Sequence, residues 1–402
     1  MRVTDVLERV MKGELSWTMA GQILGYTPRH MRRLRTTLLQ DGIDGVRDKR
    51  CGRVMPHRVP EKQVAQILKL RRERYPSYNV RHLRDTLETT HRIKVSYTYL
   101  RTLLQRAGLY HGGKEKGLHR MRRQRRPCRG MMLHIDGSEH AWLGEAYGRR
   151  DLILIQDDAD SRILYGRIVR EEGTKTCLAG ISAVLERYGL FSELYSDRGS
   201  HFAVTKKAGG RAEAGNVQIA RILKKLGIQA IYAYSPEARG RSERTFGTFQ
   251  DRFCNELAAE GITRWQEANR YLTQVFIPDY NRRFTVTPER PESAFLSTND
   301  INLKRACALE HSVTIGKDNC VRWQQQIFQV PAQPSRATYA RCKATLVEYL
   351  DDYIDIEYGT RIIARFNPDG IPLTLNSLRR LKAKKHTNSA IVANHYQHSG
   401  HL

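Results

Sequence analysis

The spacing of hydrophobic positions changes twice along the chain, and each change marks a different kind of structure. Up to about residue 110, apolar residues recur every three or four positions, which predicts amphipathic helices. From residue 131, short apolar runs alternate with helical stretches, which predicts a mixed α/β region. From residue 299, strand-like segments separated by polar turns predict a small β region.

The first helical pair lies between residues 16 and 39. Ser16 is placed to cap one helix, Gly25 supplies a turn, and Thr27 with Pro28 begins a second helix. A short helix, a glycine turn and a basic second helix are the layout of a helix-turn-helix, whose second helix enters the major groove of DNA. The candidate DNA-binding residues of this helix are Arg29, Arg32, Arg33 and Arg35.

A second unit of the same kind is predicted between residues 60 and 109. An amphipathic helix begins at Glu61, Asn79 is placed to cap a second helix, and Ser96 to cap a third. Arg101 and Arg106 on the third helix would face outward and are further candidates for DNA contact. Two tandem modules would read a longer site than one.

Charge distinguishes the regions and changes the functional interpretation. The whole chain of 402 residues has a formal net charge of +26 and a pI near 10.0. Residues 1–130 hold 31 Lys and Arg against 11 Asp and Glu, a net charge of +20, whereas residues 131–298 hold 23 against 22. Such a concentrated surplus indicates a polyphosphate partner for the first third. The nearly neutral middle third must have another task.

The densest basic run, residues 114–129, has no apolar periodicity and is predicted to be a linker. It holds eight basic residues and one acidic residue. Beside a DNA-binding module, such a linker would lie along phosphates without reading sequence. Its candidate DNA contacts are Arg122, Arg123, Arg125 and Arg126.

The middle third predicts three strands followed by alternating helices and strands, in the order βββαβαβα. Asp136 closes the first strand, Asp197 closes the fourth, and Glu243 stands at the start of a long helix. Carboxylates at strand ends are costly unless they are paired, solvated or bound to metal. Three of them together would make an oxygen-only site for Mg²⁺ or Mn²⁺. Two such ions can promote cleavage and joining of phosphodiesters.

Three motifs resemble those of bacterial insertion-sequence transposases with an integrase-type catalytic core, relatives of retroviral integrases. The segment LHIDG carries Asp136, SDRGSHF carries Asp197, and SPEARGRSERTF carries Glu243. The pattern LGYTPRHMRR is similar to the first helix-turn-helix of many such transposases. The resemblance covers roughly residues 16–290 and rests mainly on the second and third motifs.

The resemblance implies a ribonuclease-H-like core whose catalytic and metal-binding residues are Asp136, Asp197 and Glu243. His201 and Arg241 flank the motifs and could touch phosphate, so Arg241 is a candidate DNA contact. Asp197 and Glu243 lie 46 residues apart, where many relatives have nearer 35. The surplus matches a predicted surface insertion at residues 203–216.

Other acids in the core have a simpler interpretation. Asp157, Asp158 and Asp160 form a cluster that could bind metal, but they lie in a tight turn between strands, where Asp bonds its own backbone. Shaping the turn is therefore their expected role. His134 lies on the same face of its strand as Asp136, and a packing or supporting role is expected for it. On the long helix, Phe246, Phe249 and Phe253 are expected to pack in the core, on a different face from Glu243.

The predicted fold class is α/β, with N-terminal all-α tandem helix-turn-helix domains, a central ribonuclease-H-like mixed-sheet core and a C-terminal small β-barrel of the SH3-like type. The expected domains are residues 1–55 and 56–112 (helix-turn-helix), 113–130 (basic linker), 131–298 (catalytic core), 299–375 (β-barrel) and 376–402 (polar tail). The seven scattered cysteines form no CxxC pair, so neither disulfides nor structural zinc are expected.

The sequence therefore predicts a DNA transposase, a polynucleotidyl transferase that binds terminal inverted repeats and uses two Mg²⁺ or Mn²⁺ ions for cleavage and strand transfer. Two alternatives remain, a sequence-specific repressor and a non-transposing nuclease built on the same core. Because two DNA ends must be held together, a homodimer or larger assembly on double-stranded DNA is expected. With no membrane span or secretory signal apparent in the sequence, a cytoplasmic location at the bacterial nucleoid is expected.

Overall fold

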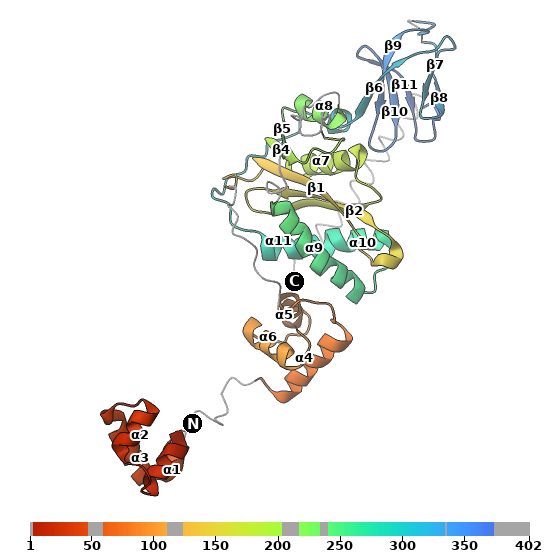
Figure 1. Cartoon of the computed structure of the whole chain (residues 1–402). Helices are drawn as coiled ribbons and strands as arrows, with labels where there is room; N and C mark the ends of the chain where they lie inside the picture. The colour runs from red at the N-terminus through yellow and green to blue at the C-terminus, as the bar shows by residue number, and fades with distance from the viewer. Residues whose placement is uncertain are drawn as a thin grey trace, which may run out of the picture. The chain divides into compact units, whose positions relative to one another are not determined.

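The computed structural model describes residues 3–46, 59–110, 124–202, 217–233, 240–333 and 336–373. The chain divides into two compact units, Met1–Arg72 and Glu73–Leu402 (Figure 1). Arg122, Arg123, most of the expected linker, the insertion at 203–216 and the polar tail lie outside the described residues. No helix in the described ranges is long and apolar enough to cross a membrane.

Three helices form the first part of the N-terminal unit: α1 (Val3–Met11), α2 (Trp17–Leu24) and α3 (Pro28–Val46). The predicted start and end of α2 are observed. Ser16 Oγ accepts a hydrogen bond from the N–H of Met19, and Gly25 adopts a left-handed φ of 69°. Val6, Leu7 and Val10 of α1 pack with Ala20 and Met31, so α1 completes the small hydrophobic core of these helices. Helix α4 (Glu61–Glu73) follows.

The second unit begins with α5 (Val80–Thr89) and α6 (Tyr97–Arg106), which pack on each other. The predicted caps are confirmed. Asn79 Oδ1 accepts from the N–H of His82, and Ser96 Oγ accepts from the N–H of Tyr99. Arg101 and Arg106 are both exposed, as expected.

A five-stranded mixed sheet is the centre of the second unit. Its strands are β1 (Met132–His140), β2 (Arg150–Asp157), β3 (Ile163–Val169), β4 (Glu193–Ser196) and β5 (Gln229–Tyr232), in the order β3-β2-β1-β4-β5. The first three strands pair antiparallel, while β4 lies parallel to both β1 and β5. A short 3₁₀ turn, Glu145–Tyr147, lies between β1 and β2. The predicted order βββαβαβα is confirmed.

Helices cover both faces of this sheet, because residues of opposite parity on the central strands are apolar (Figure 1). Ile153 and Ile155 of β2 pack under α7 (Thr174–Tyr188) and α8 (Gln218–Lys225). Leu152 and Leu154 pack under α9 (Gly240–Ala259), α10 (Trp265–Tyr271), a π-helical turn (Leu272–Phe276) and α11 (Ile277–Phe284). The face under α9 is the one that matters for the site.

The C-terminal region follows the short helix α12 (Leu303–Ala306). Strands β6 (Leu309–Thr314), β9 (Lys343–Glu348), β10 (Ile354–Tyr358) and β11 (Arg361–Phe366) form one sheet, and β7 (Cys320–Trp323) with β8 (Gln326–Gln329) forms a separate hairpin. The closed barrel expected from the sequence is not observed among the described strands. Val321 and Phe328 of the hairpin share the core of the larger sheet, so side-chain packing rather than backbone pairing holds the two together.

Phe249 tests how strongly α9 is held on the sheet. Its side chain is fully buried, with ring contacts to Phe253, Phe276 and Tyr280. We expect Phe249→Ala to lower the free energy of unfolding by about 3–5 kcal/mol, because it removes a large side chain and leaves a cavity. Urea unfolding measures this, with the exposed Val275→Ala as the control. Equal stability of the two variants would contradict this packing.

Candidate active site

Asp136 and Asp197 lie at the same level of two paired strands. In the parallel pairing of β1 and β4, His134 is opposite Tyr195, and each aspartate follows two residues later. Because side chains two residues apart on a strand point to the same face, Asp136 shares the face of His134. The antiparallel partner of Asp136 is Leu154, whose side chain packs under α9. Asp136 therefore lies on the face of the sheet that α9 covers, and Asp197 lies just beyond the end of the neighbouring strand.

The local backbone orients the second aspartate. Asp197 directly follows β4, and its Oδ1 accepts a hydrogen bond from the N–H of Gly199 at 2.8 Å. A Cβ at Gly199 would lie 3.0 Å from the same oxygen, so a glycine at this position leaves the carboxylate room. Asp136 is 8% exposed, which makes its charge costly unless it has partners.

Glu243 lies in the first turn of α9, and its side chain is exposed. Two hydrogen bonds tie this helix to the central strands. Thr245 Oγ1 donates to Gln156 Oε1 at 3.0 Å, and Gln250 Nε2 donates to Ser138 Oγ at 3.3 Å. Gln250 follows Glu243 by seven residues and so shares its helix face, and Ser138 shares the strand face of Asp136. The helix face that carries Glu243 therefore meets the strand face that carries Asp136.

The three predicted phenylalanines behave as expected. Phe246, Phe249 and Phe253 are buried between α9 and the sheet. Glu243 lies on another part of the helix surface, as the sequence predicts.

Arg241 has a partner inside the protein. Its guanidinium pairs with the buried carboxylate of Asp158, which also accepts from His134 Nε2 at 2.7 Å and from the N–H of Arg126 at 2.7 Å. Burial alone would raise the pKa of Asp158, but His134, the Arg126 N–H and Arg241 outweigh it and hold that pKa well below its usual range. Arg241 thereby anchors the start of α9, two residues before Glu243.

Asp157 and Asp160 shape the turn, and they also attach the preceding segment to the core. Asp157 accepts from the N–H groups of Ala159 and Gly130, and Asp160 accepts from the N–H of Arg162. Asp160 also pairs with Arg129 at 2.7 Å. The expected turn role of the cluster matches these contacts, and the long-range partners are additional.

Two candidate DNA contacts in the linker have partners within the core. Arg126 forms two hydrogen bonds of 3.0 Å with Glu193, and Arg125 donates to the backbone oxygen of Asp158 at 2.8 Å. These contacts order the end of the linker against the sheet.

A group that the sequence analysis did not predict adjoins the two aspartates. Glu172, Cys177 and His201 place their potential ligand atoms within 4.8 Å of one another, which no other trio of His, Cys, Asp or Glu does in the described part of the chain. His201 Nε2 lies 3.1 Å from Glu172 Oε1, and Cys177 Sγ donates to the same oxygen at 3.7 Å. Burial and the Glu172 carboxylate raise the pKa of the Cys177 thiol, so it stays protonated and hydrogen bonds account for the group. A Cβ at Gly137 would collide with the Glu172 carboxylate, so this group lies over the residue after Asp136, on the opposite face of β1.

No protein-family model matches the chain. Similarity to curated proteins is found with a putative transposase, y4bF, of Sinorhizobium fredii, at 32% identity over 288 residues. That alignment covers 72% of this chain and 63% of the relative, so less than two thirds of the relative's length is matched. The transposase for insertion sequence IS1202 of Streptococcus pneumoniae is 23% identical over 89% of this chain and 84% of its own.

Three solved structures illustrate the similarity of this chain to proteins of known structure. The catalytic core domain of BIV integrase covers 43% of this chain and 94% of its own, at 18% identity and a TM-score of 0.28. A simian T-cell lymphotropic virus intasome in complex with PP2A regulatory subunit B56 gamma covers 63% and 85%, at 13% identity and a TM-score of 0.35. The HTLV-2 integrase catalytic core domain in complex with magnesium covers 37% and 89%, at 12% identity and a TM-score of 0.28. The two curated relatives confirm the similarity to insertion-sequence transposases that the motifs predict.

Asp157 gives this region a measurable pH dependence. Burial raises its pKa from 3.8 to about 6, so the folded state favours the protonated carboxyl. This contribution to stability is complete below pH 3.8 and is lost as the pH rises through about 6, an effect of about 3 kcal/mol. We therefore expect Asp157→Asn to flatten the fall in unfolding free energy between these values.

Urea unfolding at a series of pH values measures this slope. Asp300→Asn, which changes an exposed aspartate, is the matched control and should keep the wild-type slope. An unchanged slope in Asp157→Asn would show that this carboxyl does not titrate in the range.

Proposed function

We propose that this chain, which is similar to the transposases of insertion sequences, is a DNA transposase that cuts and joins DNA through Asp136, Asp197 and Glu243. One observation carries the proposal. Asp136 lies on β1, on the sheet face covered by the helix that bears Glu243, and Asp197 directly follows β4, the parallel neighbour of β1. Packing of the sheet does not require acidic residues at these three positions, whereas metal-dependent cleavage of a phosphodiester does.

The donor set fits a hard divalent cation. The three side chains offer only carboxylate oxygens, which suit Mg²⁺ or Mn²⁺, and two ions are proposed. When bound, such ions activate the attacking oxygen and stabilise the leaving oxygen of a phosphodiester. In the described part of the chain, the three acids do not form a trio whose potential ligand atoms all lie within 4.8 Å of one another.

The protein's own residues hold the carboxylates in place for this reaction. Strand pairing sets Asp136 and Asp197, and the Gly199 N–H orients Asp197. Gln250 and Arg241 hold α9 to the sheet on either side of Glu243. Carboxylates positioned in advance need little rearrangement when the phosphodiester arrives.

DNA binding is assigned to the helical modules. In both α3 and α6 the candidate arginines, Arg29, Arg32, Arg33, Arg35, Arg101 and Arg106, are exposed. We propose that these modules are helix-turn-helix units that read the terminal inverted repeats of a mobile element in bacterial cytoplasm. Because two ends must be joined, a homodimer or larger assembly is proposed on the DNA.

Substitution of each acid tests the catalytic assignment. Asp136→Asn, Asp197→Asn and Glu243→Gln keep side-chain size but remove the ligand charge. Each should abolish cleavage and strand joining of a labelled terminal-repeat duplex in Mg²⁺, while a gel shift shows nearly unchanged binding. Asp157→Asn and Asp160→Asn are the controls. They should retain cleavage, because these two carboxylates bind backbone N–H groups, and in Asp160 also Arg129, and neither is a proposed metal ligand.

Cleavage at the wild-type rate by Glu243→Gln would show that the third acid is wrong. The alternative would then be Glu237, which lies outside the described residues.

The helix-turn-helix proposed for α2 and α3 is tested in the full chain. A fragment holding only the helical modules would divide the compact unit that contains α5, α6 and the core. Replacing Arg32 and Arg33 by Ala should weaken binding to the terminal repeat and reduce the slope of log affinity against log salt by about 2, since two phosphate contacts are lost. Gel shifts over a range of salt measure both. Arg9→Ala is the control, because Arg9 pairs with Glu14 on the protein. Equal wild-type affinity for terminal and random duplexes would contradict sequence reading.

A further inference from the structure

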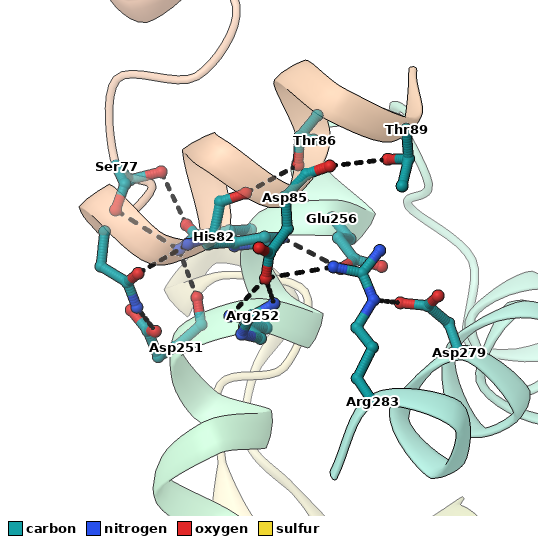
Figure 2. Close-up of polar contacts among 12 residues, drawn as sticks. Ser77, His82, Asp85, Thr86, Thr89, Asp251, Arg252, Glu256, Asp279 and Arg283 are labelled. Carbon is teal, nitrogen blue, oxygen red and sulfur yellow. Dashed lines mark hydrogen bonds and ion pairs between the residues drawn. The ribbon is translucent and has the colours of Figure 1, made fainter. Parts of the chain in front are cut away.

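The helical module α5–α6 is attached to the core by a polar contact that the sequence does not reveal. Figure 2 shows side chains of α5 and the residues before it meeting side chains of α9 and α11. We call this contact the α5–α9 seam. Its members are Ser77, Asn79, His82 and Asp85 on one side, and Asp251, Arg252, Asn255, Glu256 and Arg283 on the other.

The centre of the seam is a partly buried cluster of charges. One oxygen of Asp85 accepts from Arg252 at 3.1 Å and from Arg283 at 3.1 Å. The Arg252 side chain is 7% exposed, so its charge depends on this partner. Asp279 binds the other side of Arg283 and holds it toward the seam.

A second contact lies one turn earlier on α5. His82 Nε2 is 3.0 Å from Glu256 Oε1, and Tyr271 donates to the other oxygen of Glu256 at 3.1 Å. The His82 ring is 2% exposed and stacks on Tyr78 at 3.8 Å between ring centroids. The ring is therefore held on its face and at its edge.

The beginning of α5 is held by the residue that caps it. Asn79 Oδ1 accepts from the N–H of His82, while Asn79 Nδ2 donates to Asp251. At the exposed rim, Ser77 Oγ donates to Asn255 Oδ1 at 2.6 Å. Several directional contacts along one helix allow a single orientation, unlike an apolar face that can slide.

The seam links two functional elements of the proposed transposase. Leu83 and Leu87 of α5 and Leu100 and Leu104 of α6 are all buried where these two helices pack, which leaves Arg101 exposed on α6. On the other side, Asp251 lies eight residues after Glu243 on the same helix, roughly 12 Å along its axis. One continuous helix thus joins the seam to the proposed third acid.

We propose that the α5–α9 seam sets the distance along the DNA between the bases that α6 contacts and the phosphodiester that is cut. This inference rests on the proposed function and adds to it a set of positioning residues, with Asp85 at their centre. The seam contributes no atom to the reaction. It holds the recognition helix at one place relative to Glu243, so that cleavage falls at one position.

Asp85→Asn tests the inference in the full chain. It removes the charge that Arg252 and Arg283 share while keeping the size of the side chain. Binding to the terminal repeat should stay within about twofold, since α6 is unchanged. The rate at the wild-type phosphodiester should fall by about 10²-fold, and cuts should appear at neighbouring phosphodiesters, because a small misplacement of the substrate is costly.

The readouts are a gel shift and cleavage of an end-labelled duplex resolved to single nucleotides. Glu88→Gln is the matched control, because it removes one charge from the exposed side of α5, outside the seam, and should cut as the wild type does. If circular dichroism shows that Asp85→Asn is unfolded, the double variant Ser77→Ala/Asn255→Ala decides instead. It removes the exposed rim contact, together with one hydrogen bond from Asn255 to the backbone of α9, and should also broaden the cut positions.

Two results would overturn the inference alone. A folded Asp85→Asn that cuts at the single wild-type position and rate shows that the seam does not position the DNA. Loss of repeat binding in step with cutting shows that the seam only supports the fold of α5–α6. A wild-type chain that binds the repeat but never cuts it would instead overturn the proposed function, and the inference with it.

Discussion

The packing of α9 on the central sheet is the contact on which the rest of the second unit depends. Phe246, Phe249 and Phe253 form one face of this helix and are buried against β2 and the helices α10 and α11. The other faces of α9 can therefore carry polar and charged side chains. Glu243 stands on one of them near the start of the helix, and the residues of the α5–α9 seam stand near its end.

Buried charges then refine what the apolar core holds. Asp158 binds Arg241 at the start of α9, and Asp85 binds Arg252 near its end. Each carboxylate is largely removed from water and would be costly without its partner. Such pairs add little net stability, but they select one orientation of the helix. Their value in this protein is therefore positional, at both ends of the element that carries the proposed third acid.

Much of the core could be predicted from sequence, because its signals are local. The strand and helix order follows from changes in hydrophobic period, and the caps Ser16 and Asn79 follow from residue type. Residues 320–329 form a hairpin, because Gln324 and Gln325 adopt positive φ between β7 and β8. Gln-Gln gives no turn signal, unlike Asn-Gly.

The sequence could not predict the contacts between polar residues that lie far apart in the chain. Asp85 and Arg252 are separated by 167 positions, and neither stands in a pattern that marks it as buried. Arg126 lies in a basic run, and nothing in that run marks Glu193 as the partner of its guanidinium. Periodicity records which face of an element is apolar, but it does not record which charged group another element brings to it.

Localised hydroxyl-radical cleavage determines directly whether Asp136, Asp197 and Glu243 converge on one metal-binding site. With Fe²⁺ in place of Mg²⁺ and ascorbate as the reductant, the polypeptide is cut only near the bound ion. If the three acids share the site, cuts fall in three separate segments, around residues 136, 197 and 243, and they are suppressed by excess Mg²⁺ and absent in Asp136→Asn. Cuts confined to the turn at residues 157–160, or none around residue 243, would show that the three acids do not share a site.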